Sequence, residues 1–227
     1  MRGIAKKTLV ALAASSMAFG MAACSAERGG SSESGAVAGS EGGLIGVSMP
    51  SKSLERWNRD GSHLEELLKD EGYDVSLQYA DNKVEQQITQ IQNMINEGPK
   101  VLVVASIDGS ALAPVLEQAK SAGIPVIAYD RLIRDTEAVD YYATFDNYKV
   151  GQLQGQYIEE SLGLKDGKGP FNFEPFSGSP DDNNAKFFFS GAWDVLSPYV
   201  ESGMLTVPSG KAPSSVDDWQ SIGIQAW

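Results

Sequence analysis

Residues 44–79, LIGVSMPSKSLERWNRDGSHLEELLKDEGYDVSLQY, carry the pattern that decides the fold. Two short apolar runs, 44–48 and 75–79, predict β-strands. Between them, four apolar residues recur at the spacing of one helix face, namely Leu54, Trp57, Leu64 and Leu68. A strand, a helix and a second strand in this order predict two parallel strands joined by a crossover helix.

The same alternation continues along the chain. Three further strands are predicted at 101–105, 125–129 and 141–145. A second amphipathic helix precedes them, with one apolar face formed by Val84, Ile88, Ile91 and Ile95. We expect Asn82 and Glu85 to form a capping pair at its start and Gly98-Pro99 to end it. The sequence therefore predicts an α/β fold class, with a complete Rossmann-like parallel sheet in an N-terminal lobe over residues 44–146.

A second, similar lobe begins further along. A predicted helix over 147–162 and the residues that follow form a crossover helix and linker, 147–170. Strands are predicted at 171–176 and 204–208, and a helix at 183–200 that is broken or ended near Pro198. Few residues follow Val207, so we expect a partial, truncated C-terminal lobe over residues 171–227.

The amino-terminal segment predicts export and attachment to a membrane. Residues 1–23 read as a signal peptide with a positively charged start and an apolar core, and Met21-Ala22-Ala23-Cys24 resembles a bacterial lipobox. Cys24 is then the lipid anchor, although the usual lipobox has Leu in place of Met21. The alternative is a free cysteine in a signal peptide cut elsewhere. Residues 24–43, rich in Ser, Gly, Ala and Glu, predict a flexible tether. We expect an extracytoplasmic protein, anchored to the cell membrane in the periplasm or at the cell surface.

Composition excludes several classes of function. The chain has 18 Lys and Arg residues against 30 Asp and Glu residues, a net charge of −12. Removing residues 1–23 removes three cations and no acid, which leaves 15 against 30, or −15. Nucleic acid is therefore not an expected partner, because phosphate binding relies on clustered Lys and Arg. His63 is the single histidine and falls on the polar side of the first predicted helix, so neither a Ser-His-acid triad nor a histidine metal cluster is available. We expect no enzyme activity, no cofactor and no metal site.

Polar and aromatic residues follow the carboxyl ends of the predicted strands, where ligands collect in sheets of this kind. The candidate site residues are Lys52, Arg56, Trp57, Asp108, Asp130, Arg131, Asp182, Asn183 and Asn184. Hydroxyl groups need paired donors and acceptors, and the C–H face of a sugar packs on an aromatic ring. These residue types therefore predict a neutral, polyhydroxylated ligand.

Five stretches, in this order, resemble the periplasmic monosaccharide-binding proteins of ABC importers, in particular the multiple-sugar receptors and the xylose-binding proteins. They are GVSMPSKS at 46–53 with ERW at 55–57, ASIDGSAL at 105–112, IAYDRLI at 127–133, YYATFDN at 141–147 and GSPDDNNA at 178–185. The resemblance covers residues from about 44 to about 207. It implies a type I periplasmic-binding fold, in which two lobes are hinged around a sugar. Members of this family continue well beyond position 227.

The resemblance implies a receptor that captures a monosaccharide, an aldose in ring form, and presents it to an ABC permease. Trp57 would pack on the sugar ring, while Asp108, Asp130, Arg131 and one Asn of the pair 183–184 would donate and accept hydrogen bonds. We expect a monomer, and weak sugar binding by this chain because its second lobe is partial. The alternative function is a sugar-sensing receptor that docks to a membrane chemotaxis or kinase partner. The sequence does not choose between a pentose and a hexose.

Some candidates have a structural role as their alternative. Trp57 shares the apolar face of its helix, which favours a core position. Asp108 can instead cap the helix expected near Ala111. Among residues 182–184, we expect one to cap the following helix and another to point into the cleft.

Two further predictions concern the segment between the lobes and the aromatic run beyond it. Asp146 and Asn147 lie where the chain leaves the first lobe, so we interpret them as hinge residues, with helix capping and ligand contact as alternatives. The run Phe187-Phe188-Phe189 is expected in the core.

Overall fold

The computed structural model describes residues 41–222 of the chain. The predicted signal peptide, Cys24 and all but the last residues of the tether lie outside the described residues. Within residues 41–222, no helix is long and apolar enough to cross a membrane.

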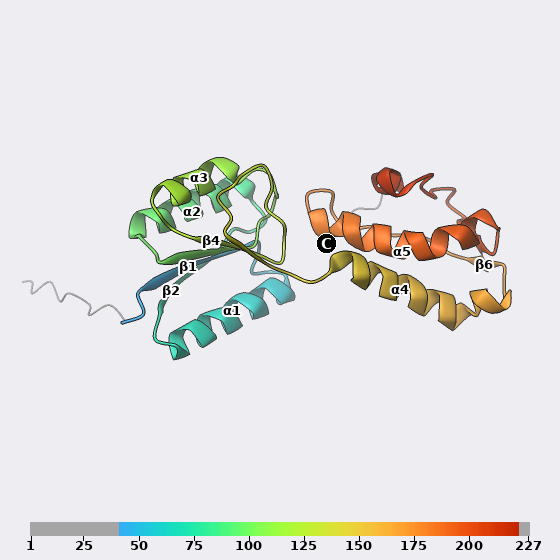
Figure 1. The fold of residues 1–227 in the computed structure, drawn as a ribbon, viewed down its shortest axis with the longest axis horizontal. Coiled ribbons are helices and arrows are strands. Elements are labelled where there is room, and N and C mark those ends of the chain that lie inside the picture. The colour runs from blue at the N-terminus through green and yellow to red at the C-terminus, as the bar shows by residue number, and fades with distance from the viewer. Residues whose placement is uncertain (1–40, 223–227) are drawn as a thin grey trace, which may run out of the picture. The chain divides into compact units, whose positions relative to one another are not determined.

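A five-stranded parallel sheet, the large sheet, forms the first half of the described chain (Figure 1). Its strands are β1 (Leu44–Met49), β2 (Asp74–Tyr79), β3 (Val101–Val104), β4 (Val126–Tyr129) and β5 (Tyr141–Ala143). They lie in the order β2-β1-β3-β4-β5, and every neighbouring pair is parallel. All five predicted strands are confirmed, with ends that shift by one or two residues. Because the strands are parallel, their carboxyl ends share one edge of the sheet.

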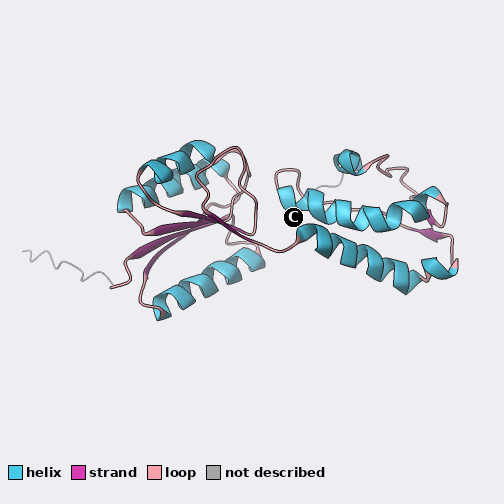
Figure 2. Ribbon diagram, viewed as in Figure 1, coloured by secondary structure: helices cyan, strands magenta, loops and turns pink. Residues whose placement is uncertain are grey.

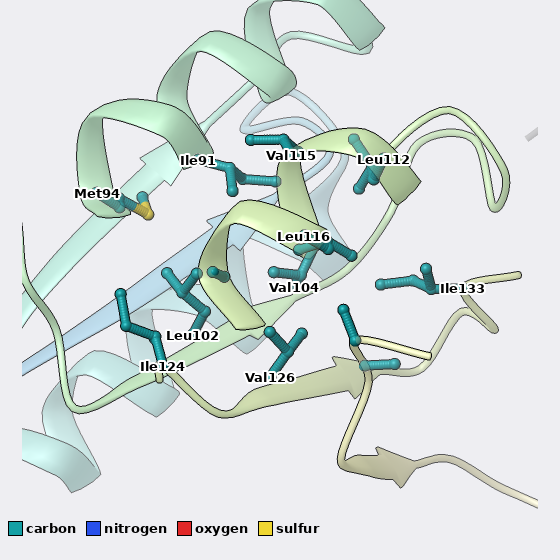
Figure 3. Close-up of a cluster of buried hydrophobic side chains, with 13 residues drawn as sticks. Ile91, Met94, Leu102, Val104, Leu112, Val115, Leu116, Ile124, Val126 and Ile133 are labelled. Atoms are coloured by element: carbon teal, nitrogen blue, oxygen red, sulfur yellow. The ribbon is translucent and has the colours of Figure 1, made fainter. Parts of the chain in front are cut away.

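Three helices cover the two faces of the large sheet (Figure 1). They are α1 (Glu55–Asp70), α2 (Val84–Glu97) and α3 (Ala113–Ser121). Helices α2 and α3 enclose one apolar cluster, which includes Ile91, Leu102, Val104 and Leu116 (Figure 3). On the opposite face, α1 places Trp57 against Val47 and Val103. Successive residues of β3 thus point to opposite faces, as the pleat of a strand requires.

The ends of α2 differ in how well the sequence predicted them. Gly98 ends the helix in the left-handed conformation, with φ +70°, as expected for a C-terminal glycine. The predicted capping pair of Asn82 and Glu85 is wrong, because Lys83 is the N-cap residue and no side chain caps the helix. Asn82 has φ +56°, and its amide donates to the carbonyl of Pro50 at 2.8 Å. That turn between β2 and α2 delays the start of the helix.

The second half of the described chain contains two long helices and a small parallel sheet (Figure 2). Its elements are α4 (Asn147–Leu162), the 3-10 helix η1 (Leu164–Asp166), β6 (Phe171–Asn172), α5 (Asn183–Glu201), β7 (Leu205–Thr206) and the 3-10 helix η2 (Val216–Ile222). The boundaries of α4 match the prediction to the residue. Strands β6 and β7 are each two residues long, so the longer strands predicted at 171–176 and 204–208 are wrong in extent.

The predicted helix over 183–200 is confirmed as α5, which ends at Glu201, three residues after Pro198, and is not broken at the proline. On either side of Pro198, Leu196 and Tyr199 lie in one apolar cluster with Ile158 of α4, and the Tyr199 hydroxyl donates to Glu159 of α4 at 2.6 Å. The two helices also pack closely along their length. A Cβ atom on Gly151 would lie 2.1 Å from the carbonyl oxygen of Phe188, and one on Gly191 would lie 2.1 Å from that of Tyr148. The two backbones therefore approach each other where side chains are missing. Packing of this kind offsets the one helical hydrogen bond that a proline removes.

Apolar clusters on both sides of α5 complete the second half. Phe189 stacks on Trp193, with ring centroids 5.5 Å apart, and both pack against Trp219 of η2, an element that the sequence did not predict. The expectation that 187–189 lie in the core holds for Phe189, which is 7% exposed. It is wrong for Phe187, which is 41% exposed.

Candidate functional site

A cavity of about 240 Å³ lies at the carboxyl edge of the large sheet, next to the start of α5. Its lining residues are Leu54, Arg56, Trp57, Asp130, Arg131, Asp182, Asn184 and Phe188. Leu54, Arg56 and Trp57 come from the N-cap and first turn of α1, Asp130 and Arg131 follow β4, and the remaining residues belong to the N-cap and first turns of α5. We call this cavity the strand-edge site. Six of its eight residues are among the nine predicted from the sequence.

Asp130 connects the end of β4 with the first turn of α5. Its backbone is left-handed, with φ +63°, which costs of order 1–3 kcal/mol in a residue other than glycine. Three donors hold its carbonyl oxygen: the hydroxyl of Tyr142 at 3.2 Å, Thr144 Oγ1 at 2.9 Å and Asn184 Nδ2 at 2.9 Å. The surrounding side chains therefore fix the direction in which the Asp130 carboxylate points.

Arg56 forms one polar wall of the strand-edge site. Its Nη2 donates to Asp130 Oδ1 at 2.8 Å, and its Nε donates to Asp60 at 3.0 Å. Burial by itself lowers the pKa of Arg56, but the hydrogen bonds to Asp130 and Asp60 and the charges of these two carboxylates together outweigh that effect and raise the pKa. The side chain keeps 42% of its surface exposed, so part of the guanidinium remains accessible from solvent.

Arg131 forms the opposite, more deeply buried wall. Its Nη1 donates to the carbonyl oxygens of Ser106 and Ile107 at 3.1 and 3.2 Å. Its Nε lies 3.2 Å from Asp182 Oδ2, which makes an ion pair whose angles fall short of a hydrogen bond. Both side chains of this pair are about nine-tenths buried. The backbone of the segment after β3 thus orients a cation toward the start of α5.

The indole of Trp57 lies between these charged groups and the core. It is 3% exposed and packs in the apolar cluster under α1. The guanidinium carbons of Arg56 and Arg131 lie 4.7 and 5.3 Å from its ring centroid, within the range of cation–π attraction. Trp57 is therefore both a core residue under α1 and a lining residue of the strand-edge site.

Asp182 has two functions at the start of α5. It is the N-cap residue, and its Oδ1 accepts from the amide of Asn184 at 2.9 Å. Burial raises the pKa of Asp182 above its usual value of 3.8, and the attraction of Arg131 offsets only part of that rise. The expectation that one residue of 182–184 caps the helix is confirmed.

The side chain of Asn184 is almost fully used within the protein. Its Oδ1 accepts from Asn147 Nδ2 at 3.0 Å and from the Tyr142 hydroxyl at 3.4 Å, while its Nδ2 donates to Asp130. One amide hydrogen is left for a ligand. Asn147, predicted as a hinge residue, therefore bonds with α5. Its neighbour Asp146 is the N-cap of α4 and accepts from the amide of Lys149.

Three predicted residues do not line the strand-edge site. Lys52 is exposed, and its Nζ lies 5.8 Å from the ring centroid of Tyr79. Asp108 accepts from the amides of Ser110 and Ala111, so its carboxylate caps the turn before α3. Asn183 is half-buried at the first position of α5. Conversely, Leu54 and Phe188 were not selected from the sequence, since Leu54 was assigned to the apolar face of the first helix and Phe188 to an aromatic run expected in the core.

No group of three or more His, Cys, Asp or Glu residues that could hold a metal ion occurs within residues 41–222. His63 is exposed on α1, 3.8 Å from Glu66. The arrangement of the strand-edge site offers paired donors and acceptors around an indole, which is suited to recognition of a polar ligand.

The sequence model of the family described as periplasmic binding protein domain matches residues 45–225 of this chain. The chain belongs to the periplasmic binding protein domain family. A multiple sugar-binding periplasmic protein of Azospirillum brasilense is 58% identical over 74% of this chain. A D-xylose-binding periplasmic protein of Escherichia coli is 41% identical over 77% of it. The match covers 47% and 50% of these two proteins, so the chain spans about half the length of the curated relatives it matches.

A solved structure of the family supports the same fold. The ABC transporter solute-binding protein of Clostridium phytofermentans, solved with bound β-D-glucose, is 60% identical with a TM-score of 0.73. The match covers 75% of this chain and 53% of that one. The α/β architecture with a parallel sheet is therefore that of the type I periplasmic-binding fold, and the family resemblance found in the sequence is confirmed.

Proposed function

We propose that this protein is an extracytoplasmic solute-binding protein that captures a monosaccharide for an ABC-type sugar importer. The observation that carries the proposal is the strand-edge site. Arg56, Trp57, Asp130, Arg131, Asp182 and Asn184 come from separate stretches of a chain of the periplasmic binding protein family and line one cavity. The printed names of close relatives describe sugar-binding proteins, which supports the ligand class.

The ligand we propose is an aldose in ring form. Two carboxylates and two guanidinium groups provide charge-assisted hydrogen bonds to hydroxyls, each of which contributes about 1.5 to 3 kcal/mol. The cavity, at about 240 Å³, is smaller than the sites that hold drug-sized ligands, which favours a single sugar unit. Catalysis is not part of the proposal, because recognition alone accounts for the groups that line the cavity.

Attachment through a lipidated Cys24 and delivery to a membrane permease complete the proposal. The lipobox-like sequence and the tether support it. Cells that express the full chain are labelled with a radioactive fatty acid. We expect label on the wild type and none on a Cys24→Ala variant. Equal labelling of both, or recovery of the wild type in the cytosol, would refute the anchoring.

Sugar binding is tested by titrating the chain with D-glucose, D-xylose and L-arabinose, followed by calorimetry and by saturation-transfer NMR, which detects millimolar affinity. We expect affinity weaker than micromolar, because Arg56 keeps 42% of its side chain exposed and water competes there with a sugar hydroxyl. Arg131→Ala removes a charged donor and should weaken binding by roughly one to two decades.

Two further variants make this test specific. Arg56→Ala removes the more exposed wall of the site, so it should stay folded and weaken binding by about one decade. Arg134→Ala removes the same charge from an exposed position outside the cavity, three residues after Arg131, and should bind like the wild type. The site assignment is wrong if the folded Arg56 and Arg131 variants bind as the wild type does, and the ligand class is wrong if no sugar binds at millimolar concentration.

A further inference from the structure

Gln87 is a polar residue on the buried face of α2. It is fully buried, with an exposed fraction of 0%, and it shares that face with Ile91 and Met94. An amide in such a position costs several kcal/mol unless its donors and acceptor are paired. The other buried side chains of α2 belong to the apolar cluster between α2, α3 and the sheet. The hydrogen-bond partners of the Gln87 amide therefore show what this polar residue does inside an apolar cluster.

All the contacts of the Gln87 amide lie at the carboxyl ends of β1 and β3. Its Nε2 donates to Ser48 Oγ at 3.1 Å and to the carbonyl of Ala105 at 2.8 Å. Its Oε1 accepts from the amide of Ile107 at 2.9 Å. The side chain thus pairs with the backbone of residues 105–107 on both sides of Ser106, much as a neighbouring strand would. It holds the segment directly after β3 in one conformation.

The segment that Gln87 holds is the one that holds Arg131. Ser106 and Ile107 provide the two carbonyl oxygens that accept from Arg131 Nη1. Both backbone polar groups of Ile107 are hydrogen-bonded, since its amide donates to Gln87 and its carbonyl accepts from Arg131. From Arg131 the series of contacts reaches Asp182 and the strand-edge site. Gln87 itself does not line that cavity.

We propose that Gln87 is a positioning residue of the strand-edge site. It fixes residues 105–107 so that their carbonyls hold the Arg131 guanidinium against Asp182 and within reach of a bound hydroxyl. In this role it sets the affinity of the site without touching the ligand. The proposal rests on the proposed function for the nature of the ligand, while the link from Gln87 to Arg131 is independent of it.

Stability measurements test that link without any sugar. Gln87→Met keeps the length of the side chain and removes its hydrogen bonds, and it is combined with Arg131→Met in a double-mutant cycle by urea unfolding. We expect the unfolding equilibrium constant of the double variant to be smaller, by at least about fivefold, than additivity of the two single effects predicts. Additive effects, within about twofold, would overturn the proposal.

Gln90→Met is the matched control. Gln90 lies on the same helix and its Nε2 donates to the carbonyl of Tyr79 at 3.0 Å, away from residues 105–107. Its effect should add to that of Arg131→Met within about twofold. A coupling as large as that of Gln87 would mean that any polar residue of α2 behaves in this way, and would also overturn the proposal.

A second measurement keeps the proposal testable if Gln87→Met does not fold. Amide hydrogen exchange is measured in Arg131→Met at Ile107, whose amide donates a hydrogen bond to Gln87 Oε1. We expect exchange at Ile107 to accelerate by at least about tenfold relative to Val104 of β3, because the segment loses its second support. An unchanged ratio of the two exchange rates would contradict the link.

D-glucose binding completes the test. We expect folded Gln87→Met to bind D-glucose at least about fivefold more weakly than the wild type, and Gln90→Met to differ by less than twofold. Unchanged affinity in Gln87→Met would refute the positioning role. If the wild type binds no sugar at all, the proposed function fails, while the mutant cycle and the exchange ratio still decide whether Gln87 positions Arg131.

Discussion

Replacing Arg131 with methionine leaves a buried carboxylate without its counter-charge. Asp182 is 5% exposed, and its Oδ2 forms an ion pair with Arg131 Nε at 3.2 Å. Removing one partner of a buried pair costs about 3 to 5 kcal/mol, because the other charge is then stranded in a medium of low polarity. Against a typical total of about 5 to 15 kcal/mol, this is a large loss. With m-values of about 1 to 3 kcal/mol per molar urea, the midpoint should fall by at least about 1 M.

The double variant Arg131→Met/Asp182→Asn should be more stable than Arg131→Met alone. Asparagine keeps the N-cap acceptor at the start of α5, since Asn and Asp are equally good caps, and it removes the stranded charge. Asp182→Asn by itself should cost less than Arg131→Met, because the Arg131 guanidinium that it leaves without a counter-charge still donates to the carbonyls of Ser106 and Ile107, and because burial already raises the pKa of Asp182.

The pH dependence gives the same prediction a second readout. A raised pKa means that the folded chain binds the Asp182 proton more tightly than the unfolded chain does. The ionised group therefore destabilises the fold at neutral pH, and this cost is lost as pH falls from the raised pKa to the usual value of 3.8. In Arg131→Met the effect should grow because the attraction of Arg131 is removed, so acidification from pH 7 to about pH 4 should recover stability relative to the wild type.

Urea unfolding of the wild type, the two single variants and the double variant at pH 7 and about pH 4 tests both predictions, with Arg134→Met as the control for loss of an exposed arginine. That control should stay within about 0.5 kcal/mol of the wild type. Equal instability of Arg131→Met and the double variant at pH 7, or no gain in stability of Arg131→Met on acidification, would show that the loss does not come from the unpaired carboxylate.

Two further predictions concern α4 and its neighbours. Gly151→Ala should destabilise the fold by about 1 to 3 kcal/mol although alanine favours helices, because its Cβ would lie 2.1 Å from the Phe188 carbonyl oxygen. Thermal melting measures this loss, with Ser161→Ala as the control at an exposed position of α4. Equal stability of the two variants would contradict the close packing of α4 and α5. Lys165 and Tyr199 bond to Glu159 and lower its pKa below the usual 4.5, so its stabilising contribution is present above that value and is lost as pH falls through the lowered one. Glu159→Gln should therefore lose less stability than the wild type between pH 5 and 3, and parallel acid unfolding curves for the two would show that the carboxylate does not matter.

The sequence predicted the elements whose signal is local. Strands β1 to β5 were found because short apolar runs alternate with amphipathic ones, and α4 was found to the residue because a cap at Asp146 and Gly163 mark its ends. The helix over 183–200 was also found, but a break near Pro198 was left open because a proline is a local breaker, whereas the contacts of α5 with α4 cannot be seen in consecutive residues.

The sequence predicted the types of residue in the candidate site better than it predicted which individual residues line the cavity. Residues directly after strands, such as Asp130 and Arg131, were found because strand ends mark ligand sites. Asp108 satisfies the same rule, yet its carboxylate is used by the amides of Ser110 and Ala111. Gln87 gave a usable signal, a polar residue within an apolar helix face, but its partners lie on β1 and in the segment directly after β3, and they cannot be found by spacing along the chain.

By itself, the sequence determined the order of strands and helices and the family, because hydrophobic periodicity and short motifs are properties of consecutive residues. Only the tertiary structure decided which polar groups meet. Arg131 and Asp182, like Asp130 and Asn184, are about fifty residues apart along the chain and become partners where the edge of the large sheet meets the start of α5. Their pairing depends on how separate elements pack, and burial at that meeting point sets the pKa of Asp182.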